Sequence, residues 1–161
     1  MNAQAILNTQ IFIGLIVYIC VARWYVLPKL YSISFKAALA PLLLVSALRI
    51  TGLYFLLPQL TNNLPAAFSG PAGWGDFSVG ILALIGAILL RKRGNAGVFF
   101  AWLYAILGAA DFMYALYLGN VYQMHNHLGA AWLPVTLFGP GLMVVVGLIW
   151  IVLLKHPNRS K

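Results

Sequence analysis

Residues 37–57 read AALAPLLLVSALRITGLYFLL, an apolar run whose only charged side chain is Arg49. A helix that crosses the hydrocarbon core of a bilayer needs about 20 consecutive, mostly apolar residues. Lipid offers the backbone no hydrogen-bond partner, so a run of this length is expected to be helical. The run therefore predicts a membrane-spanning helix that carries a charge inside the membrane.

Four further apolar runs lie at about residues 5–27, 71–90, 96–118 and 131–154. Of the 161 residues, 63% are hydrophobic and 7% are charged, and the mean hydropathy is +0.92. A soluble domain carries roughly 25% charged residues. We therefore expect an all-α polytopic membrane protein, with a single transmembrane domain over residues 1–161 built as a bundle of five transmembrane helices. The first residues, MNAQAILNTQ, lack the positive charges of a secretory signal, so the first run is expected to remain as a span.

Nine of the ten Lys and Arg residues lie in three segments, at positions 23–36, 91–93 and 155–161. Because an excess of Lys and Arg stays on the cytoplasmic side, we expect the N-terminus outside and the C-terminus in the cytoplasm. This topology accounts for the formal net charge of +8. The partner that it implies is the lipid bilayer, and no nucleic-acid partner is expected.

Three charged side chains remain that topology does not explain: Arg49, Asp76 and Asp111. At a rise of about 1.5 Å per residue, they lie roughly 3, 7 and 5 Å outward of the centres of their spans. A lone charge near the bilayer centre costs at least about 2.5 kcal/mol. We therefore expect the one Arg and the chain's two acidic residues to meet inside the outer half of the bundle.

Two interpretations of this cluster stay open. In the first the role is structural: the charges form an ion pair, or Arg49 snorkels outward while Asp76 caps the start of the third span, since Asp is a preferred N-cap. In the second the three residues line a small polar pocket that opens to the outer side. Asp111 lies within its span, so a cap is excluded and pairing with Arg49 is expected. Tyr104 and Tyr114 share a helix face with Asp111, at spacings of seven and three, and are candidate lining residues.

Two histidines, His125 and His127, form a His-Asn-His sequence between the fourth and fifth runs. Neutral imidazoles bind zinc, copper and iron. However, no Cys, Glu or third outer His completes the three or four ligands of a zinc site. Solvated loop histidines are the favoured interpretation, and a metal site is the alternative. The single Cys20 excludes an intramolecular disulfide. No motif identifies a cofactor or a catalytic residue.

The middle of the chain contains a distinctive series of short motifs. They are Arg49-Ile-Thr-Gly52, Leu64-Pro65-Ala-Ala-Phe68, Pro71-Ala72-Gly73-Trp74-Gly75-Asp76 and Gly108-Ala-Ala-Asp111. This pattern resembles a group of small, uncharacterised bacterial inner-membrane proteins. The resemblance implies a multi-pass location in the bacterial inner membrane and supports treating the three charges as one site, but it implies no activity.

The expected function is binding or transport of a small polar or anionic solute, or of a proton, at the Arg/Asp cluster. The alternative is a structural or accessory subunit of a membrane complex, in which the buried charges only fix helix packing. A lipid- or quinone-linked membrane enzyme with an aspartate as acid or base is a third interpretation. A homo-oligomer or a partner in a membrane complex is compatible with the first two.

Overall fold

The computed structural model describes residues 2–92 and 95–156 and is helical, with no strand in these ranges. Arg93, Arg159 and Lys161, which contribute to the expected topology, lie outside the described residues. Five helical segments are long and apolar enough to cross a membrane: Ala3–Ser32, Phe35–Leu56, Ala66–Arg91, Ala96–Val121 and Gly129–Lys155. The expected all-α fold with five membrane-length helices is thereby confirmed, and these helices are consistent with a multi-pass membrane protein.

Two of the five segments change helix type along their length. The first consists of α1 (Ala3–Val21), a π-helical turn η1 (Ala22–Val26) and α2 (Leu27–Ser32). The second consists of α3 (Phe35–Ser46) and a 3-10 helix, η2 (Ala47–Leu56). The third and fourth are α4 (Ala66–Arg91) and α5 (Ala96–Val121). After the short 3-10 turns η3 (Met124–Asn126) and η4 (Gly129–Ala131), the chain ends its described part in α6 (Trp132–Lys155).

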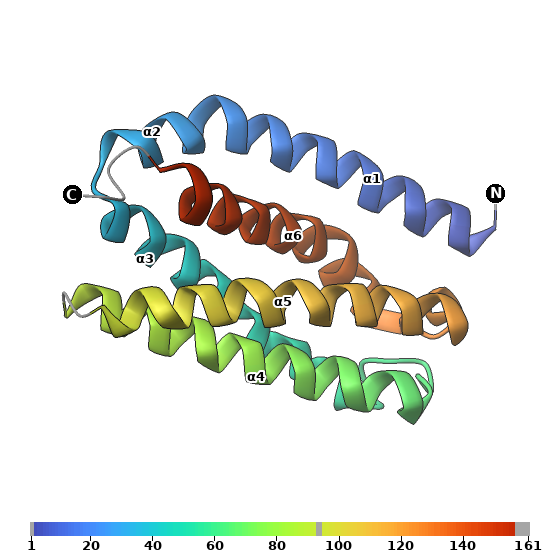
Figure 1. Cartoon of the computed structure of the whole chain (residues 1–161). Coiled ribbons are helices and arrows are strands. Elements are labelled where there is room, and N and C mark those ends of the chain that lie inside the picture. The colour runs from blue at the N-terminus through green and yellow to red at the C-terminus, as the bar shows by residue number, and fades with distance from the viewer. Residues whose placement is uncertain (1, 93–94, 157–161) are drawn as a thin grey trace.

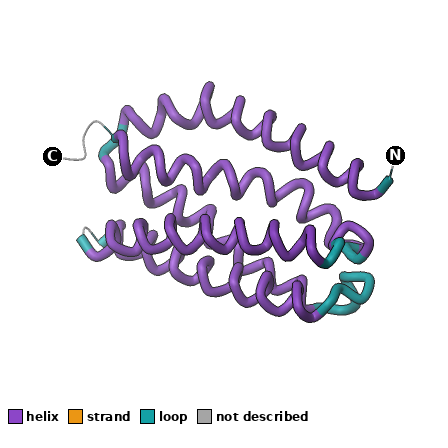
Figure 2. Tube along the Cα trace, turned by 45° about the vertical axis from the view of Figure 1, so that its right-hand side comes forward, coloured by secondary structure: helices purple, strands orange, loops and turns teal. Residues whose placement is uncertain are grey.

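The helices form two groups that α3 connects. In one group η2 and α5 both pack on α4, and in the other α1 packs on α6 (Figure 1). The helix α3 contacts both α4 and α6. The main core lies where these elements meet, and fully buried side chains from four helices meet there: Leu39, Leu43, Ala83, Ala105 and Ile149. The tube in Figure 2 shows the helices running side by side, with the loops gathered at the two ends of the bundle.

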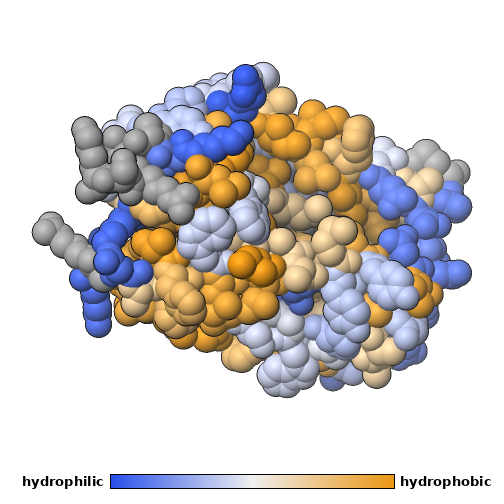
Figure 3. Space-filling model, viewed as in Figure 1, coloured by the Kyte–Doolittle hydropathy of each residue, from blue (hydrophilic) through white to orange (hydrophobic). Residues whose placement is uncertain are grey.

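At each end of the bundle a hydrogen bond joins segments that are far apart in the sequence. The start of α1 and the end of α6 lie at opposite ends of the bundle (Figure 1). At the end where α6 terminates, Lys36 Nζ of α3 donates a hydrogen bond to Asn95 Oδ1 at 3.2 Å. At the other end the backbone nitrogen of Asn62 donates to the carbonyl oxygen of His127 at 2.8 Å. An apolar surface lies between more hydrophilic ends (Figure 3), as expected for a chain surrounded by lipid.

The first helix continues beyond the end that the sequence predicts. The run was expected to stop before Pro28, because proline interrupts an α-helix. In the structure the nitrogen of Leu27 donates to the carbonyl oxygen of Ala22, five residues earlier, and Pro28 stands at the start of α2. A π-turn of this kind is a known way for a helix to absorb such an irregularity, so the helix extends to Ser32.

The third helix begins earlier than predicted, at Ala66 rather than near Pro71. Its N-cap is Pro65, which makes no side-chain capping bond, and Pro71 lies inside the helix. Asp76 is therefore nearly three turns into α4. The interpretation of Asp76 as an N-cap is wrong, because the Gly- and Pro-containing approach is itself helical in the bundle, where membrane helices tolerate both residues.

Candidate functional site

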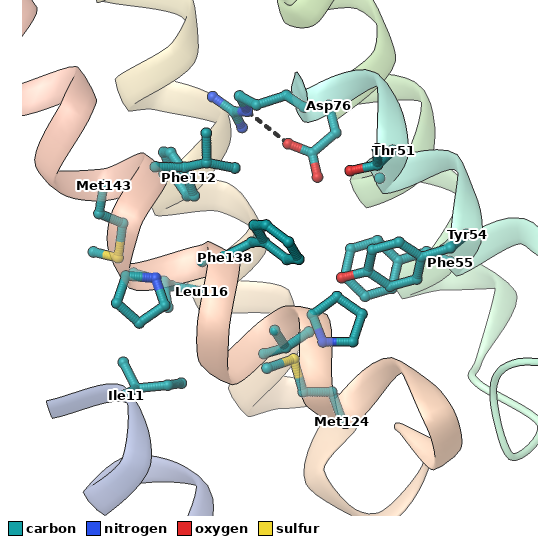
Figure 4. A pocket seen from close by; sticks show the side chains of 18 of the residues that line it. Ile11, Thr51, Tyr54, Phe55, Asp76, Phe112, Leu116, Met124, Phe138 and Met143 are labelled. Atoms are coloured by element: carbon teal, nitrogen blue, oxygen red, sulfur yellow. Dashed lines mark hydrogen bonds and ion pairs between the residues drawn. The ribbon is translucent and has the colours of Figure 1, made fainter. Parts of the chain in front are cut away.

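The site is built around the guanidinium group of Arg49, which η2 places between α4 and α5 and which is only 1% exposed. Nε donates a hydrogen bond to Asp76 Oδ1 at 2.7 Å, which is drawn as a dashed line in Figure 4. Nη1 donates to the carbonyl oxygen of Gly108 at 3.1 Å, and Nη2 donates to Asp111 Oδ2. The structure thus brings together the three charged residues for which the sequence predicts a similar depth in the membrane. Each guanidinium nitrogen has a hydrogen-bond partner.

An aromatic ring covers one face of the guanidinium group. The Cζ atom of Arg49 lies 4.1 Å from the centre of the Phe112 ring, which comes from α5 one residue after Asp111. A cation is attracted to the negative face of such a ring, and the attraction grows when water is excluded. Burial of an unpaired charge in lipid is costly, so the two carboxylates, the carbonyl and the ring together explain how Arg49 is tolerated here.

The 3-10 geometry of η2 aligns the residues that face α4. A 3-10 helix has three residues per turn, so residues at a spacing of three lie directly above one another. Arg49, Gly52 and Phe55 have this spacing, follow Ser46 at the end of α3, and are all buried. This row of buried residues is a signal in the sequence that our interpretation of the run as an α-helix missed.

Glycines occur where the charged side chains cross between helices. A Cβ atom built on Gly52 would overlap the Asp76 side chain, and one built on Gly75 would overlap the Asp111 carboxylate. A Cβ on Gly108 would lie 3.2 Å from Arg49 Nη1. The absence of side chains at these positions lets η2, α4 and α5 approach closely enough for the ion pairs to form.

The cluster has one more acidic group than basic groups. When both carboxylates are ionised, Arg49, Asp76 and Asp111 carry a formal charge of −1. The side chains of Asp76 and Asp111 are 21% and 14% exposed, whereas that of Arg49 is almost fully covered. Asp76 Oδ2 has no hydrogen-bond donor among the described residues. The accessible part of the cluster therefore belongs to the two aspartate side chains.

A cavity of about 120 Å³ adjoins the cluster (Figure 4). It lies between η2, α4, α5 and α6, with Ile11 of α1 at its edge. Arg49, Thr51, Tyr54 and Asp76 are the polar residues in its lining. The remaining side chains are apolar and include four phenylalanines, Phe55, Phe68, Phe112 and Phe138. It is thus an apolar pocket with a charged group at one place on its wall.

The two tyrosines named from the sequence do not line this cavity. Tyr104 is fully buried beside Gly108 and interacts electrostatically with Arg49. Neither its hydroxyl nor that of the buried Ser46 makes a well-formed hydrogen bond with a described residue. Tyr114 is 51% exposed. The candidate pocket role of Tyr114 needs correction, because the α5 residue that reaches the cavity one turn after Asp111 is Ala115.

Comparison with known proteins gives a family but no activity. The family model described as a domain of unknown function, DUF8737, matches residues 6–154. The chain belongs to the DUF8737 family. The match covers all five membrane-length helices and the three charged residues, so the site lies within the family domain. No curated protein and no solved structure matches the chain.

The histidines of this DUF8737 chain lie at the ends of the bundle. His127 Nδ1 is 3.0 Å from the carbonyl oxygen of Asn62, and since a carbonyl only accepts, Nδ1 is the donor and Nε2 is left without a proton in the neutral ring. In residues 2–92 and 95–156, no group of three or more His, Cys, Asp or Glu side chains could hold a metal ion. A metal at His125 and His127 would need ligands from elsewhere.

Proposed function

We propose that this protein binds a small solute in the pocket beside Arg49, Asp76 and Asp111, as a binding or transport protein of the bacterial inner membrane. The observation that carries this proposal is a cavity that reaches a partly exposed carboxylate inside the membrane. Ionisable residues within membrane spans commonly mark solute or proton pathways. The expected orientation, with the N-terminus outside, would open the site to the outer half of the membrane.

The hydrogen bonds of the cluster favour some members of the expected class over others. An anion would have to compete with two carboxylates for Arg49, because the three guanidinium nitrogens already have partners. A proton or a cation would instead neutralise the acidic group in excess. Of the polar or anionic solutes and the proton expected from the sequence, we therefore favour a proton or a hydrogen-bond-donating polar solute over an anion, and we add positively charged solutes to the candidates.

A structural role is the second candidate, and one observation favours it. Arg49 joins three elements, since it bonds from η2 to Asp76 on α4 and to Asp111 and Gly108 on α5. A group bonded in this way can define how the helices pack without binding anything else. This candidate corresponds to the structural or accessory subunit expected as an alternative, whose partner would be another membrane protein.

The test is the thermal stability of the purified protein in detergent, measured with a panel of small cations, anions, quinones, lipids and metal ions. A ligand that binds only the folded state adds about 2.7 kcal/mol of stability at 100 times its dissociation constant. We expect at least one compound to stabilise the protein and to lose its effect in the Asp76→Asn variant. If no compound stabilises the wild type, binding at this site is contradicted.

Exchange of the paired residues separates the two candidates. The double variant Arg49→Asp with Asp111→Arg keeps one cation and two carboxylates in the cluster. A purely structural cluster predicts that the exchange restores the stability lost in each single variant and that no ligand stabilises either form. A binding site predicts that ligand stabilisation is lost in the exchanged protein, although the protein folds.

A further inference from the structure

We propose that the ligand of this pocket is a small organic ammonium ion with an apolar body. This inference rests on the proposed function and names its ligand class. It combines three observations: the sign of the charge that the pocket presents, the aromatic rings on its walls, and its size and position in the membrane.

The charge that the pocket presents is negative. Asp76 lines the cavity, and its Oδ2 has no donor among the described residues. Arg49 also lines the cavity, but its nitrogens are bonded to Asp76, Asp111 and the Gly108 carbonyl, and Phe112 covers one face. With two carboxylates for one guanidinium, a cation is the ligand that brings the cluster to neutrality.

The walls favour an organic cation over a metal ion. Calcium takes six to eight oxygen ligands and magnesium keeps a near-octahedral oxygen shell. The side-chain oxygens that the lining offers, however, are one carboxylate oxygen of Asp76 without a donor and the hydroxyls of Thr51 and Tyr54. Aromatic faces, in contrast, attract ammonium groups whose charge is spread over methyl or methylene carbons. Tyr54, Phe55 and Phe138 all lie in the part of the cavity shown beside Asp76 in Figure 4.

The size and mouth of the cavity limit the ligand further. The volume of about 120 Å³ is slightly below the roughly 150 Å³ of an engineered apolar cavity that holds benzene. Three lining residues are exposed, Thr51, Leu116 and Phe138, and all three belong to membrane-length helices. The mouth therefore faces the hydrocarbon region, and a ligand with an apolar body can enter from the membrane.

The inference is tested with three compounds of nearly the same shape: choline, its uncharged carbon isostere dimethylbutanol, and the anion dimethylbutyrate. Binding is measured for the purified full-length protein by calorimetric titration. We expect choline to bind at least about tenfold more tightly than dimethylbutanol, and dimethylbutyrate to bind most weakly. In the Asp76→Asn variant we expect the affinity for choline to fall to that for dimethylbutanol, while the affinity for dimethylbutanol is unchanged.

A second pair of variants tests the aromatic wall. Phe138→Ala is expected to weaken choline binding at least about fivefold. Leu137 is an exposed neighbour on the same helix, and Leu137→Ala is expected to leave choline binding unchanged. Both side chains are at least half exposed, Phe138 at 57% and Leu137 at 50%, so neither change should unfold the protein.

The outcomes distinguish this inference from the proposed function. Equal affinity of the wild type for choline and dimethylbutanol, or no binding of choline, overturns the inference without any variant having to fold. In that case a different panel compound whose effect is lost in Asp76→Asn still supports a binding site. Failure of every compound overturns both.

Discussion

Asp76 Oδ1 accepts a 2.7 Å hydrogen bond from Arg49 Nε across the contact between η2 and α4. The same carboxylate lines the cavity with its other oxygen available. One side chain thus belongs both to the contact that holds the helices together and to the surface that a ligand would touch. Variants of this group must therefore be measured for stability and for binding.

Removal of the buried positive charge is expected to destabilise the bundle strongly. Arg49→Gln leaves two carboxylates without a counter-charge inside the membrane, and breaking a buried pair in this way costs about 3–5 kcal/mol. The measurement is the free energy of unfolding in detergent. Arg91→Gln, which removes an exposed charge at the end of α4, is the control and should change stability by less than about 0.5 kcal/mol.

A methyl group between the crossing helices is expected to separate the ion pairs. Gly75→Ala places a Cβ on the Asp111 carboxylate, and overpacking of this kind costs about 1–3 kcal/mol. Gly70→Ala on the same helix is the matched control, because its Cβ has nothing within 4 Å. There we expect no loss of stability, since Ala is favoured over Gly within helices by up to about 1 kcal/mol. Equal effects of the two changes would contradict the close approach at Gly75.

A larger side chain in the cavity wall is expected to block binding while the protein stays folded. Ala115→Leu projects into the cavity from α5, and Ala110→Leu adds the same atoms to the exposed face of that helix. The first should abolish stabilisation by choline and the second should preserve it. Because the new side chain enters existing space, its effect on the free energy of unfolding should be below about 1 kcal/mol. Retained binding in Ala115→Leu would place the ligand elsewhere.

Binding of choline is expected to weaken as the pH falls. The ionisable groups that interact electrostatically with Asp76 are Arg49 and Tyr54 from η2 and Tyr104 and Asp111 from α5. On lowering the pH from about 8 toward about 4, arginine stays charged and tyrosine stays neutral, so only the carboxylates change state. Each proton taken up removes one negative charge, so affinity is greatest on the alkaline side. The check is the dissociation constant across this range, and dimethylbutanol serves as the control because it has no charge to lose.

The orientation is tested by labelling single cysteines from outside the cell. In a Cys20→Ala background, Asn126→Cys and Lys92→Cys place a thiol at opposite ends of the bundle, both at exposed positions. An impermeant maleimide added to intact bacteria is expected to label the first and not the second. Labelling of Lys92→Cys alone would reverse the orientation that the Lys and Arg distribution predicts.

Several parts of the fold and site follow directly from the sequence. Five apolar runs predict five helices because lipid leaves the backbone no alternative. The contact among Arg49, Asp76 and Asp111 follows from their shared depth and from the cost of isolated charges. Neither argument needs knowledge of which helices are neighbours, which explains why both succeed.

Other features depend on tertiary packing and could not be predicted in the same way. Helix α4 begins at Ala66 because small residues around Pro71 remain helical when neighbours surround them. The outward position of Tyr114 differs from that of Ala115 by a single residue of helix rotation, about 100°, and a spacing rule does not resolve such a step. The cavity is a property of the space between η2 and α6, which no single run encodes.

The 3-10 helix η2 also determines how far the second span reaches. With a rise of about 2.0 Å per residue over η2 and about 1.5 Å over α3, the 22 residues of Phe35–Leu56 extend about 38 Å. The same residues as a continuous α-helix would extend only about 33 Å, against about 39 Å for the 26 residues of α4. The stretched geometry thus lets the shorter helix match the membrane thickness that its longer neighbours cross. A change of residues 47–56 to α-helix would shorten this span at its Leu56 end by about 5 Å and turn Phe55 away from Arg49. Hydrophobic matching and the charged site therefore depend on the same ten residues.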